Sequence, residues 1–262
     1  MAASTLDPRR PIGYFVLNGL AHVGRLSLLV VEMARGLTEY RVWFPRFLDE
    51  AWNVGIGSLF IVLLVSGFAG GVMAFQTGYQ FQASLPKYIV GSLVTEGIVL
   101  ELGAVLTALV LAGRIGARYA AELGTMRVTE QIDALESLGR SPSSHLIVPR
   151  VLAGLLMIPT LTVFANVTGI LVGWYSVKLV LPVSDADFIR GARVFWHPFD
   201  AYYSIIKSFF FAGAITLIPC YVGFNTKGGA EGVGKATTTA VVSSSVVILL
   251  LDTVLAKILL HQ

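Results

Sequence analysis

The chain has 262 residues, of which 55% are hydrophobic and only 13% are charged, and its formal net charge is +3. Soluble domains carry about 25% charged residues, so the composition excludes a soluble enzyme, a disordered chain and a basic nucleic-acid-binding protein, and it indicates several membrane-spanning helices. The single cysteine, Cys220, excludes an intrachain disulfide, a cysteine-based zinc site and a CxxC redox pair.

Residues 1–50 form a separate N-terminal region. Within it, residues 12–31 are apolar enough to suggest a span, but they contain Asn18, His22 and Arg25. On a helix these polar residues lie on a different side from the leucines, which is typical of a helix lying in the membrane interface. The segment also lacks the cleavage site of a signal peptide. We therefore expect an interfacial helix, with a sixth span as the alternative.

Residues 51–262 form the transmembrane domain, and five apolar runs in it predict five spanning helices. About 20 apolar residues suffice to cross the hydrocarbon core. Pro159 lies inside the third run and predicts a kink or a re-entrant turn. The runs cover residues 54–75, 89–113, 151–180, 205–224 and 238–260.

Lysine and arginine residues predict the orientation, because they concentrate on the cytoplasmic side of membrane proteins. With five spans, most of them share one side if the N-terminus is cytoplasmic. Residues 114–148 and 225–237 would then be cytoplasmic, and residues 76–88 and 181–204 would lie outside. Lys207 and Lys257 would fall near the outer ends of their spans.

Small residues at GxxxG spacing let helices approach closely. Gly67 and Gly71 have this spacing in the first run, as do Gly169 and Gly173 in the third. Packing within the chain is the simpler interpretation. The first run is nevertheless the best candidate for a dimer contact through Gly67 and Gly71.

Acidic residues inside apolar runs usually face a cavity, a partner or a transport pathway. Glu96 and Glu101 lie in the second run, about 140° apart on a helix, so they do not share a face. Glu101 is the deeper of the two and suits either a functional cavity or a hydrogen bond between helices. Asp252 lies in the fifth run, where nearby Lys257 and His261 suggest the outer interface.

Residues 229–236 read GAEGVGKA, which partly matches the sequence motif of a phosphate-binding P-loop. The hydroxyl residue that would hold Mg²⁺ is replaced by Ala236, and an apolar run precedes the motif instead of a strand. We expect a turn leading into the fifth span, with no ATP site and no metal site in this chain.

The segment between the second and third runs predicts an amphipathic helix over about residues 118–139. Arg118 and Glu122 are spaced i,i+4, a pairing that supports a helix in water. Val128, Ile132 and Leu135 lie along one side, with charged residues on the others. Such a helix is either a connector or a docking surface for a cytoplasmic protein.

The same segment carries a resemblance to a known family. Residues 121–142 read AELGTMRVTEQIDALESLGRSP, residues 101–117 read ELGAVLTALVLAGRIGA, and the chain ends in GVGKATTTAVVSSSVVILLLDTVLAKILL before its last two residues. These stretches closely resemble the MlaE/YrbE family of ABC-transporter permeases, which includes the chloroplast TGD permease. The resemblance covers nearly all of the chain after about residue 50.

The resemblance implies a homodimeric permease in the bacterial inner membrane that contains no cofactor of its own. Its partners would be cytoplasmic ATPases that bind ATP and Mg, a small STAS-domain protein and an MCE-domain protein outside. The cargo would be phospholipid moved between the inner membrane and the cell envelope, which maintains the lipid asymmetry of the outer membrane.

The resemblance also implies two sites in this sequence. The first is a coupling helix that docks on the ATPase, formed by Glu122, Met126, Arg127, Thr129, Glu130, Gln131, Asp133, Leu135 and Glu136. The second is a lipid pocket at the outer part of the first two spans, formed by Val72, Phe75, Gln76, Tyr79 and Glu101.

The chain departs from the family pattern at three positions. Leu100 stands where an arginine is common, Ala104 where proline is common, and Thr239 where the last helix often has an arginine. Without the arginine at position 100, the surroundings of Glu101 are expected to be less polar, and without the arginine at position 239 the contacts with a lipid headgroup are expected to differ. These departures affect the expected cargo more than the expected architecture.

Two other classes of function fit the residues alone. A secondary transporter could use Glu101 or Asp252 as a proton site and would need no ATPase. A scaffold could anchor the MCE-domain protein without transporting anything. If the chain is a permease, sterol or fatty acid is the alternative to phospholipid as its cargo.

Overall fold

The computed structural model describes residues 24–80, 86–181 and 183–260, and these contain helices and connecting segments but no strand. Five helical stretches are long and apolar enough to span a membrane: Tyr40–Gln80, Ile89–Val128, Ser143–Val180, Pro198–Phe224 and Gly229–Leu260. The predicted all-helical fold with five spans is therefore confirmed. Residues 24–36 are helical, whereas residues 12–23 of the expected interfacial helix lie outside the described residues.

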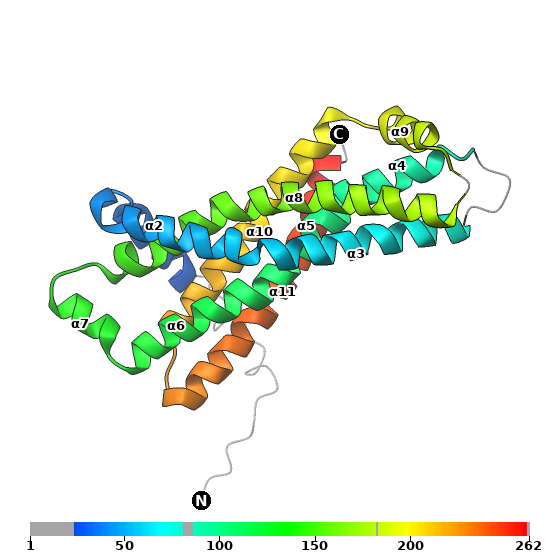
Figure 1. The fold of residues 1–262 in the computed structure, drawn as a ribbon. Helices are drawn as coiled ribbons and strands as arrows, with labels where there is room; N and C mark the ends of the chain where they lie inside the picture. The colour runs from blue at the N-terminus through cyan, green and yellow to red at the C-terminus, as the bar shows by residue number, and fades with distance from the viewer. Residues whose placement is uncertain (1–23, 81–85, 182, 261–262) are drawn as a thin grey trace, which may run out of the picture.

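The elements follow one another along the chain as shown in Figure 1. Their bounds are α2 Tyr40–Val54, α3 Ile56–Gln80, α4 Ile89–Glu96, η1 Gly97–Leu102, α5 Gly103–Leu111, η2 Ala112–Gly116, α6 Ala117–Val128, α7 Gln131–Ser137, η3 Ser143–Ile147, α8 Val148–Val180, α9 Asp185–Val194, α10 Pro198–Phe224 and α11 Gly229–Leu260.

The second span is longer than the predicted run because the helix continues through α6 to Val128. Two π-helical segments, η1 and η2, interrupt it on either side of α5. Glu101 lies in η1, so this carboxylate is carried by an irregular turn in the middle of a span. Single π-helical turns inside α-helices are frequent at functional sites.

Helices α3 and α8 lie side by side, and small residues set their separation (Figure 1). A Cβ atom on Gly70 would lie 2.0 Å from the backbone oxygen of Gly169, so only glycine fits there. Gly67 and Gly71 are buried against α8 of the same chain. Their GxxxG spacing therefore serves packing within the chain, which was the simpler interpretation, and a dimer contact through these two glycines stays a prediction.

Helix α8 is continuous from Val148 to Val180 although Pro159 lies inside it. The re-entrant turn allowed for at Pro159 is therefore wrong. The GAEGVGKA motif forms the first two turns of α11, not a separate turn, and its Lys235 pairs with Glu231 of the same helix. The motif consequently has the conformation of a helix and not that of a P-loop.

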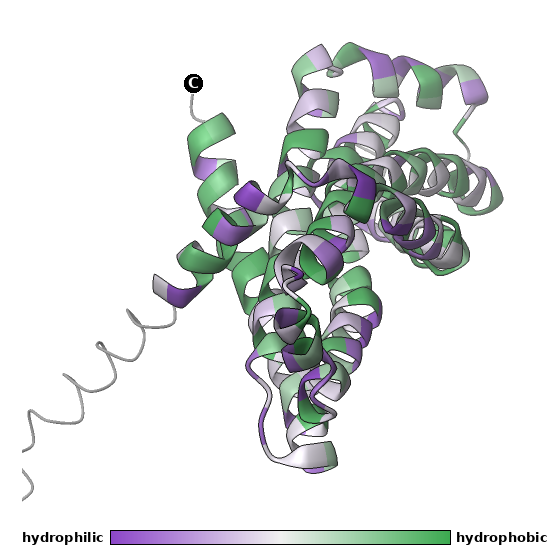
Figure 2. Ribbon diagram, turned by 90° about the vertical axis from the view of Figure 1, so that its left-hand side faces the viewer, coloured by the Kyte–Doolittle hydropathy of each residue, from purple (hydrophilic) through white to green (hydrophobic). Residues whose placement is uncertain are grey.

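The two ends of α8 define two ends of the bundle (Figure 1). The α7 end holds α2, α6 and α7, and the α9 end holds α4 and the short helix α9. Helix α9 was not predicted from the sequence. Its N-cap is Ser184, whose hydroxyl oxygen accepts a hydrogen bond from the backbone N–H of Asp187 at 3.1 Å. Figure 2 shows mixed polar and apolar residues along α9, in contrast to the mainly apolar spans.

Candidate functional site

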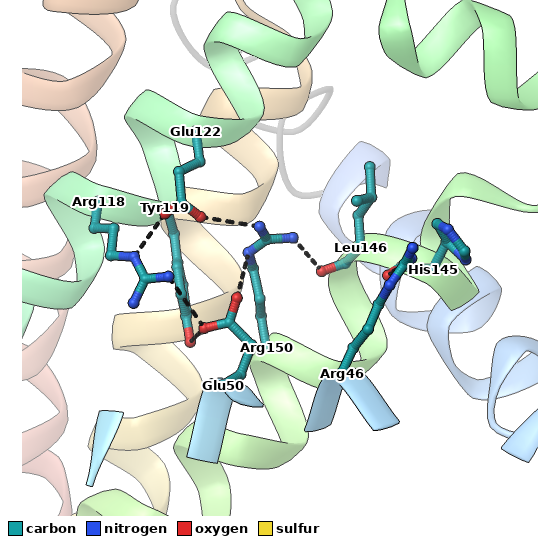
Figure 3. Close-up of polar contacts among 8 residues, drawn as sticks. All are labelled: Arg46, Glu50, Arg118, Tyr119, Glu122, His145, Leu146 and Arg150. Atoms are coloured by element: carbon teal, nitrogen blue, oxygen red, sulfur yellow. Dashed lines mark hydrogen bonds and ion pairs between the residues drawn. The ribbon is translucent and has the colours of Figure 1, made fainter. Parts of the chain in front are cut away.

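Four charged side chains form a closed ring at the α7 end of the bundle (Figure 3). Glu122 of α6 contacts Arg118 Nε at 2.6 Å through one oxygen and Arg150 Nη2 at 3.0 Å through the other. Glu50 of α2 closes the ring, at 3.5 Å from Arg150 Nε and 3.8 Å from Arg118 Nη2. We call these four residues the Arg150 ring. It connects α2, α6 and α8, which are distant in the sequence.

Arg150 is the most buried member of the ring, with 8% of its side chain exposed. Its third nitrogen, Nη1, donates to the backbone oxygen of Leu146 at 2.8 Å. The Tyr119 ring lies 5.5 Å from the guanidinium, and the Tyr119 hydroxyl donates to Glu50 at 3.4 Å. A buried charge with this many partners is costly to leave unpaired, by about 3–5 kcal/mol when one partner is removed.

Next to the ring, α6 ends and α7 begins at a sharp turn. Glu130 has φ 60°, a left-handed conformation that a residue other than glycine adopts at a cost. The predicted helix over residues 118–139 is therefore two helices, and its turn lies at Glu130. Gly139, with φ 71°, follows the end of α7, close to the predicted end of the segment.

The predicted coupling residues divide between the two faces of this segment. Glu122 is turned inward and belongs to the Arg150 ring. Arg127 pairs with Asp133 across the turn. Met126, Arg127 and Leu135 are partly buried, and the exposed members are Thr129, Glu130, Gln131, Asp133 and Glu136.

A cavity of about 330 Å³ lies beneath α7. Its walls include Met126, Ile132 and Leu135 from the coupling segment and Arg46 from α2. Arg46 Nη1 donates to the backbone oxygen of His145 at 3.0 Å, which joins α2 to η3 at the cavity's edge (Figure 3). Helix α7 therefore lies over a partly open space, bordered by η3 and by α2 and α6, two of the three helices that the Arg150 ring connects.

A second charged cluster lies within the spans. Lys207 of α10 has a fully buried side chain, and its Nζ lies 3.0 Å from Glu101 and 2.5 Å from Asp252 of α11. Nζ also donates to the backbone oxygen of Leu100 at 2.9 Å. The Tyr203 ring lies 4.9 Å from Nζ. We call Glu101, Lys207 and Asp252 the Lys207 triad.

The three members of the triad differ in exposure. The side chain of Glu101 is 46% exposed, that of Asp252 is 20% exposed, and that of Lys207 is not exposed. Lys207 and Asp252 pair with each other inside the bundle, and their expected position near the outer ends of their spans stays a prediction. Two carboxylates share one ammonium, and Glu101 is the member of the triad that reaches furthest to the surface of the chain.

The predicted lipid pocket is only partly assembled in this chain. Val72, Phe75, Gln76 and Tyr79 lie along one exposed face of α3, with Tyr79 the most exposed at 85%. Glu101 lies on η1 and is directed to Lys207. Among the described residues, no hydrogen bond or ion pair joins Glu101 to the four residues of α3.

Sequence reasoning did not identify Glu50, Arg150 or Lys207. Each is a charge within or beside an apolar run, and such charges usually have a partner. That rule points to Lys207 from the sequence alone. The partners themselves come from other helices, so only the fold reveals the ring and the triad.

Comparison with known proteins gives consistent matches. Residues 47–258 match the family described as "Permease MlaE". A "probable ABC transporter permease protein" of Rickettsia bellii is 31% identical over 235 residues, which cover 90% of this chain and 91% of that protein. One with the same description from Synechocystis is 38% identical over 193 residues, covering 74% and 73%. "Protein TRIGALACTOSYLDIACYLGLYCEROL 1, chloroplastic" of Arabidopsis thaliana is 36% identical over 242 residues, covering 92% and 68%.

Proposed function

The chain belongs to the MlaE permease family and is a multi-pass membrane permease subunit of an ABC transporter, and from this premise we propose that its cargo is phospholipid. Family membership favours this class of function over a proton-coupled secondary transporter or a scaffold. The Arabidopsis relative has the name of a galactolipid, which supports a lipid as cargo.

The Lys207 triad is the observation that carries the proposal. A lipid has an apolar body and a polar headgroup, so its path needs apolar surface with a few charges at membrane depth. Glu101 is half-exposed in the middle of a span and is backed by buried Lys207. A headgroup that reaches Glu101 could replace this carboxylate as a partner of Lys207. The triad would then be a charged binding site for the headgroup within the hydrocarbon region.

The exposed face of α3 would supply the apolar part of this path. Phe75 and Tyr79 project from α3 with about half or more of their surface exposed. An acyl chain could lie against them while the headgroup remains polar. A sterol or fatty acid would use the same apolar face, but its smaller polar group would make less use of the triad.

Energy for transport would come from a partner ATPase that binds ATP and Mg, because permease subunits of ABC transporters hydrolyse no ATP themselves. The exposed residues of α7 and the Glu130 turn form the proposed docking surface. A displacement of α6 would also move α2 and α8, because the Arg150 ring joins these three helices by ion pairs.

The proposed setting is the bacterial inner membrane, with the α7 end in the cytoplasm and the α9 end outside. Two copies of the chain would form the permease. An MCE-domain protein would receive or deliver lipid at the α9 end, and a STAS-domain protein would accompany the ATPase. Such a system would maintain the lipid asymmetry of the outer membrane.

Affinity purification of the tagged chain from its own membranes tests this function. We expect an ABC ATPase in stoichiometric amount and phospholipid retained in the complex, both identified by mass spectrometry. A complex without an ATPase would contradict the transporter assignment. Retention of sterol or fatty acid in place of phospholipid would contradict the cargo and leave the assignment of the permease intact.

A further inference from the structure

An apolar groove of about 290 Å³ lies between α8 and α9, and no residue of the two charged clusters lines it. Its lining contains a single charged residue, Arg193, at the end of α9. The other lining residues are apolar or aromatic: Ile170, Leu171, Trp174, Phe188, Ile189 and Ala192.

One wall of the groove is fixed by polar contacts. The Trp174 indole N–H donates to Asp185 at 3.1 Å, and Lys178 Nζ pairs with the same carboxylate oxygen at 2.7 Å. The Lys178 ammonium also lies 4.4 Å from the Trp174 ring. Trp174 is therefore held in place, and the charge of Lys178 is compensated by Asp185.

The opposite wall, α9, is held by close backbone packing against α4. A Cβ atom on Gly191 would lie 1.7 Å from the backbone oxygen of Tyr88, and one on Gly91 would lie 2.2 Å from that of Phe188. The two helices touch through glycines and leave no space for α9 to approach α4 further. The groove is therefore a built feature of the fold.

The charge at the end of the groove is uncompensated. Arg193 is exposed, and no carboxylate among the described residues pairs with its guanidinium. Arg190, on the same helix, differs because its guanidinium lies 5.6 Å from the Tyr88 ring. An apolar groove with one free guanidinium at its end is complementary to an acyl chain linked to a phosphate.

We propose that this groove binds a phospholipid, with an acyl chain along Leu171 and Trp174 and the phosphate at Arg193. The depth fits, because α9 follows the end of the span formed by α8, and tryptophan and arginine side chains commonly anchor at the headgroup level. The site shares no residue with the Lys207 triad or the exposed face of α3. The proposed lipid is therefore a resident lipid separate from the cargo, and the proposal does not depend on what the protein transports.

A photo-crosslinking titration tests the proposal. Benzoylphenylalanine replaces Leu171 in the full chain, which is purified in detergent and titrated with dioleoylphosphatidylglycerol, and the adduct is identified by mass spectrometry. An arginine–phosphate contact is strong enough that Arg193→Gln should raise the half-saturating lipid fraction about tenfold. Arg190→Gln, the matched control on the same helix, should leave it unchanged.

A second lipid and a second variant complete the test. Dioleoylglycerol has the same acyl chains without the phosphate. We expect it to label the protein that retains Arg193 only weakly, to the same extent as phosphatidylglycerol labels the Arg193→Gln variant. Arg193→Lys keeps the charge and should retain most binding, which controls for misfolding of the glutamine variant. Equal labelling by the two lipids, or no effect of Arg193→Gln, would contradict the proposal and show that the groove is ordinary lipid-facing surface. A protein adduct at position 171 in native membranes would assign the groove to a partner helix and overturn the proposal.

Discussion

Arg150 of α8 and Glu122 of α6 are 28 residues apart in the sequence, yet their side chains form a 3.0 Å ion pair at the α7 end of the bundle. The pair ties the helix that leads into α7 directly to the longest helix of the fold. Because Glu50 and Arg118 complete the ring, a shift of α6 cannot occur without moving α2 and α8 or breaking buried ion pairs.

The first prediction concerns the stability of this ring. Arg150→Met should lower the free energy of unfolding by about 3–5 kcal/mol, because Glu50 and Glu122 lose their buried partner. Thermal unfolding of the purified protein measures the loss. Lys235→Met is the control: its pair with Glu231 is exposed, so it should change stability by no more than about 1 kcal/mol.

The ring should also behave as one unit. Glu122→Gln combined with Arg150→Met should cost less than the sum of the two single variants, since residues of one network do not act independently. Strict additivity of the two losses would show that the ion pairs contribute separately and would remove the basis for a mechanical link.

The second prediction concerns the Lys207 triad. Lys207→Met should destabilise the protein by about 3–5 kcal/mol, because two carboxylates are then left near each other without a cation. Adding Glu101→Gln and Asp252→Asn should recover much of the stability while lipid transport remains lost. Recovery of transport in the triple variant would show that the triad is structural only.

The third prediction concerns the turn between α6 and α7. Glycine adopts positive φ freely, so Glu130→Gly should keep the turn, whereas Glu130→Val should strain it by about 1–2 kcal/mol. We expect the glycine variant to keep more ATPase binding than the valine variant in co-purification. If both variants bind equally, the geometry of the turn has no part in docking.

The carboxylate of Glu130 can be tested separately. Glu130→Lys combined with Leu135→Asp reverses the charge and the polarity of the proposed docking surface. Membrane insertion should remain normal, and ATP hydrolysis should lose its dependence on the permease. Intact assembly and transport in this double variant would remove the coupling assignment from α7.

The fourth prediction concerns the apolar path on α3. Benzoylphenylalanine in place of Phe75 or Tyr79 should capture phospholipid during turnover more strongly than at Phe60, which is also exposed and lies on the same helix. The reason is that a transported lipid would spend time on this proposed path, whereas Phe60 would meet only bulk lipid. Equal capture at Phe60 would indicate contact with bulk lipid at all three positions.

The spans were predictable because each crosses the membrane as a long apolar run, and that signal is local. Small errors arose at the span ends: α6 extends the second span to Val128, and α11 begins at Gly229 in what was expected to be a turn. Helix formation there depends on packing against neighbouring helices, which a single run of sequence does not contain. Helix α9 was missed for the same reason, since its burial rests on Phe188 and Gly191 packed against α4.

The candidate site was less predictable than the fold. Glu101 could be selected as an acidic residue in a span, but its partner Lys207 comes from another span, and counting charges does not reveal which residues pair. Glu122 was expected on the docking surface because it belongs to the family motif, yet its side chain pairs with buried Arg150. Ion pairs between distant segments require the three-dimensional arrangement, whereas apolar periodicity does not.

The most direct test of the account is lipid movement by the complex of this chain with its co-purifying ATPase, reconstituted into phospholipid vesicles. The assay follows a labelled phospholipid as it leaves the membrane in the presence of ATP, with and without Lys207→Met. We predict movement that requires ATP and is lost in the variant although the complex still assembles. Movement that proceeds without ATP, or that follows a proton gradient, would contradict the account.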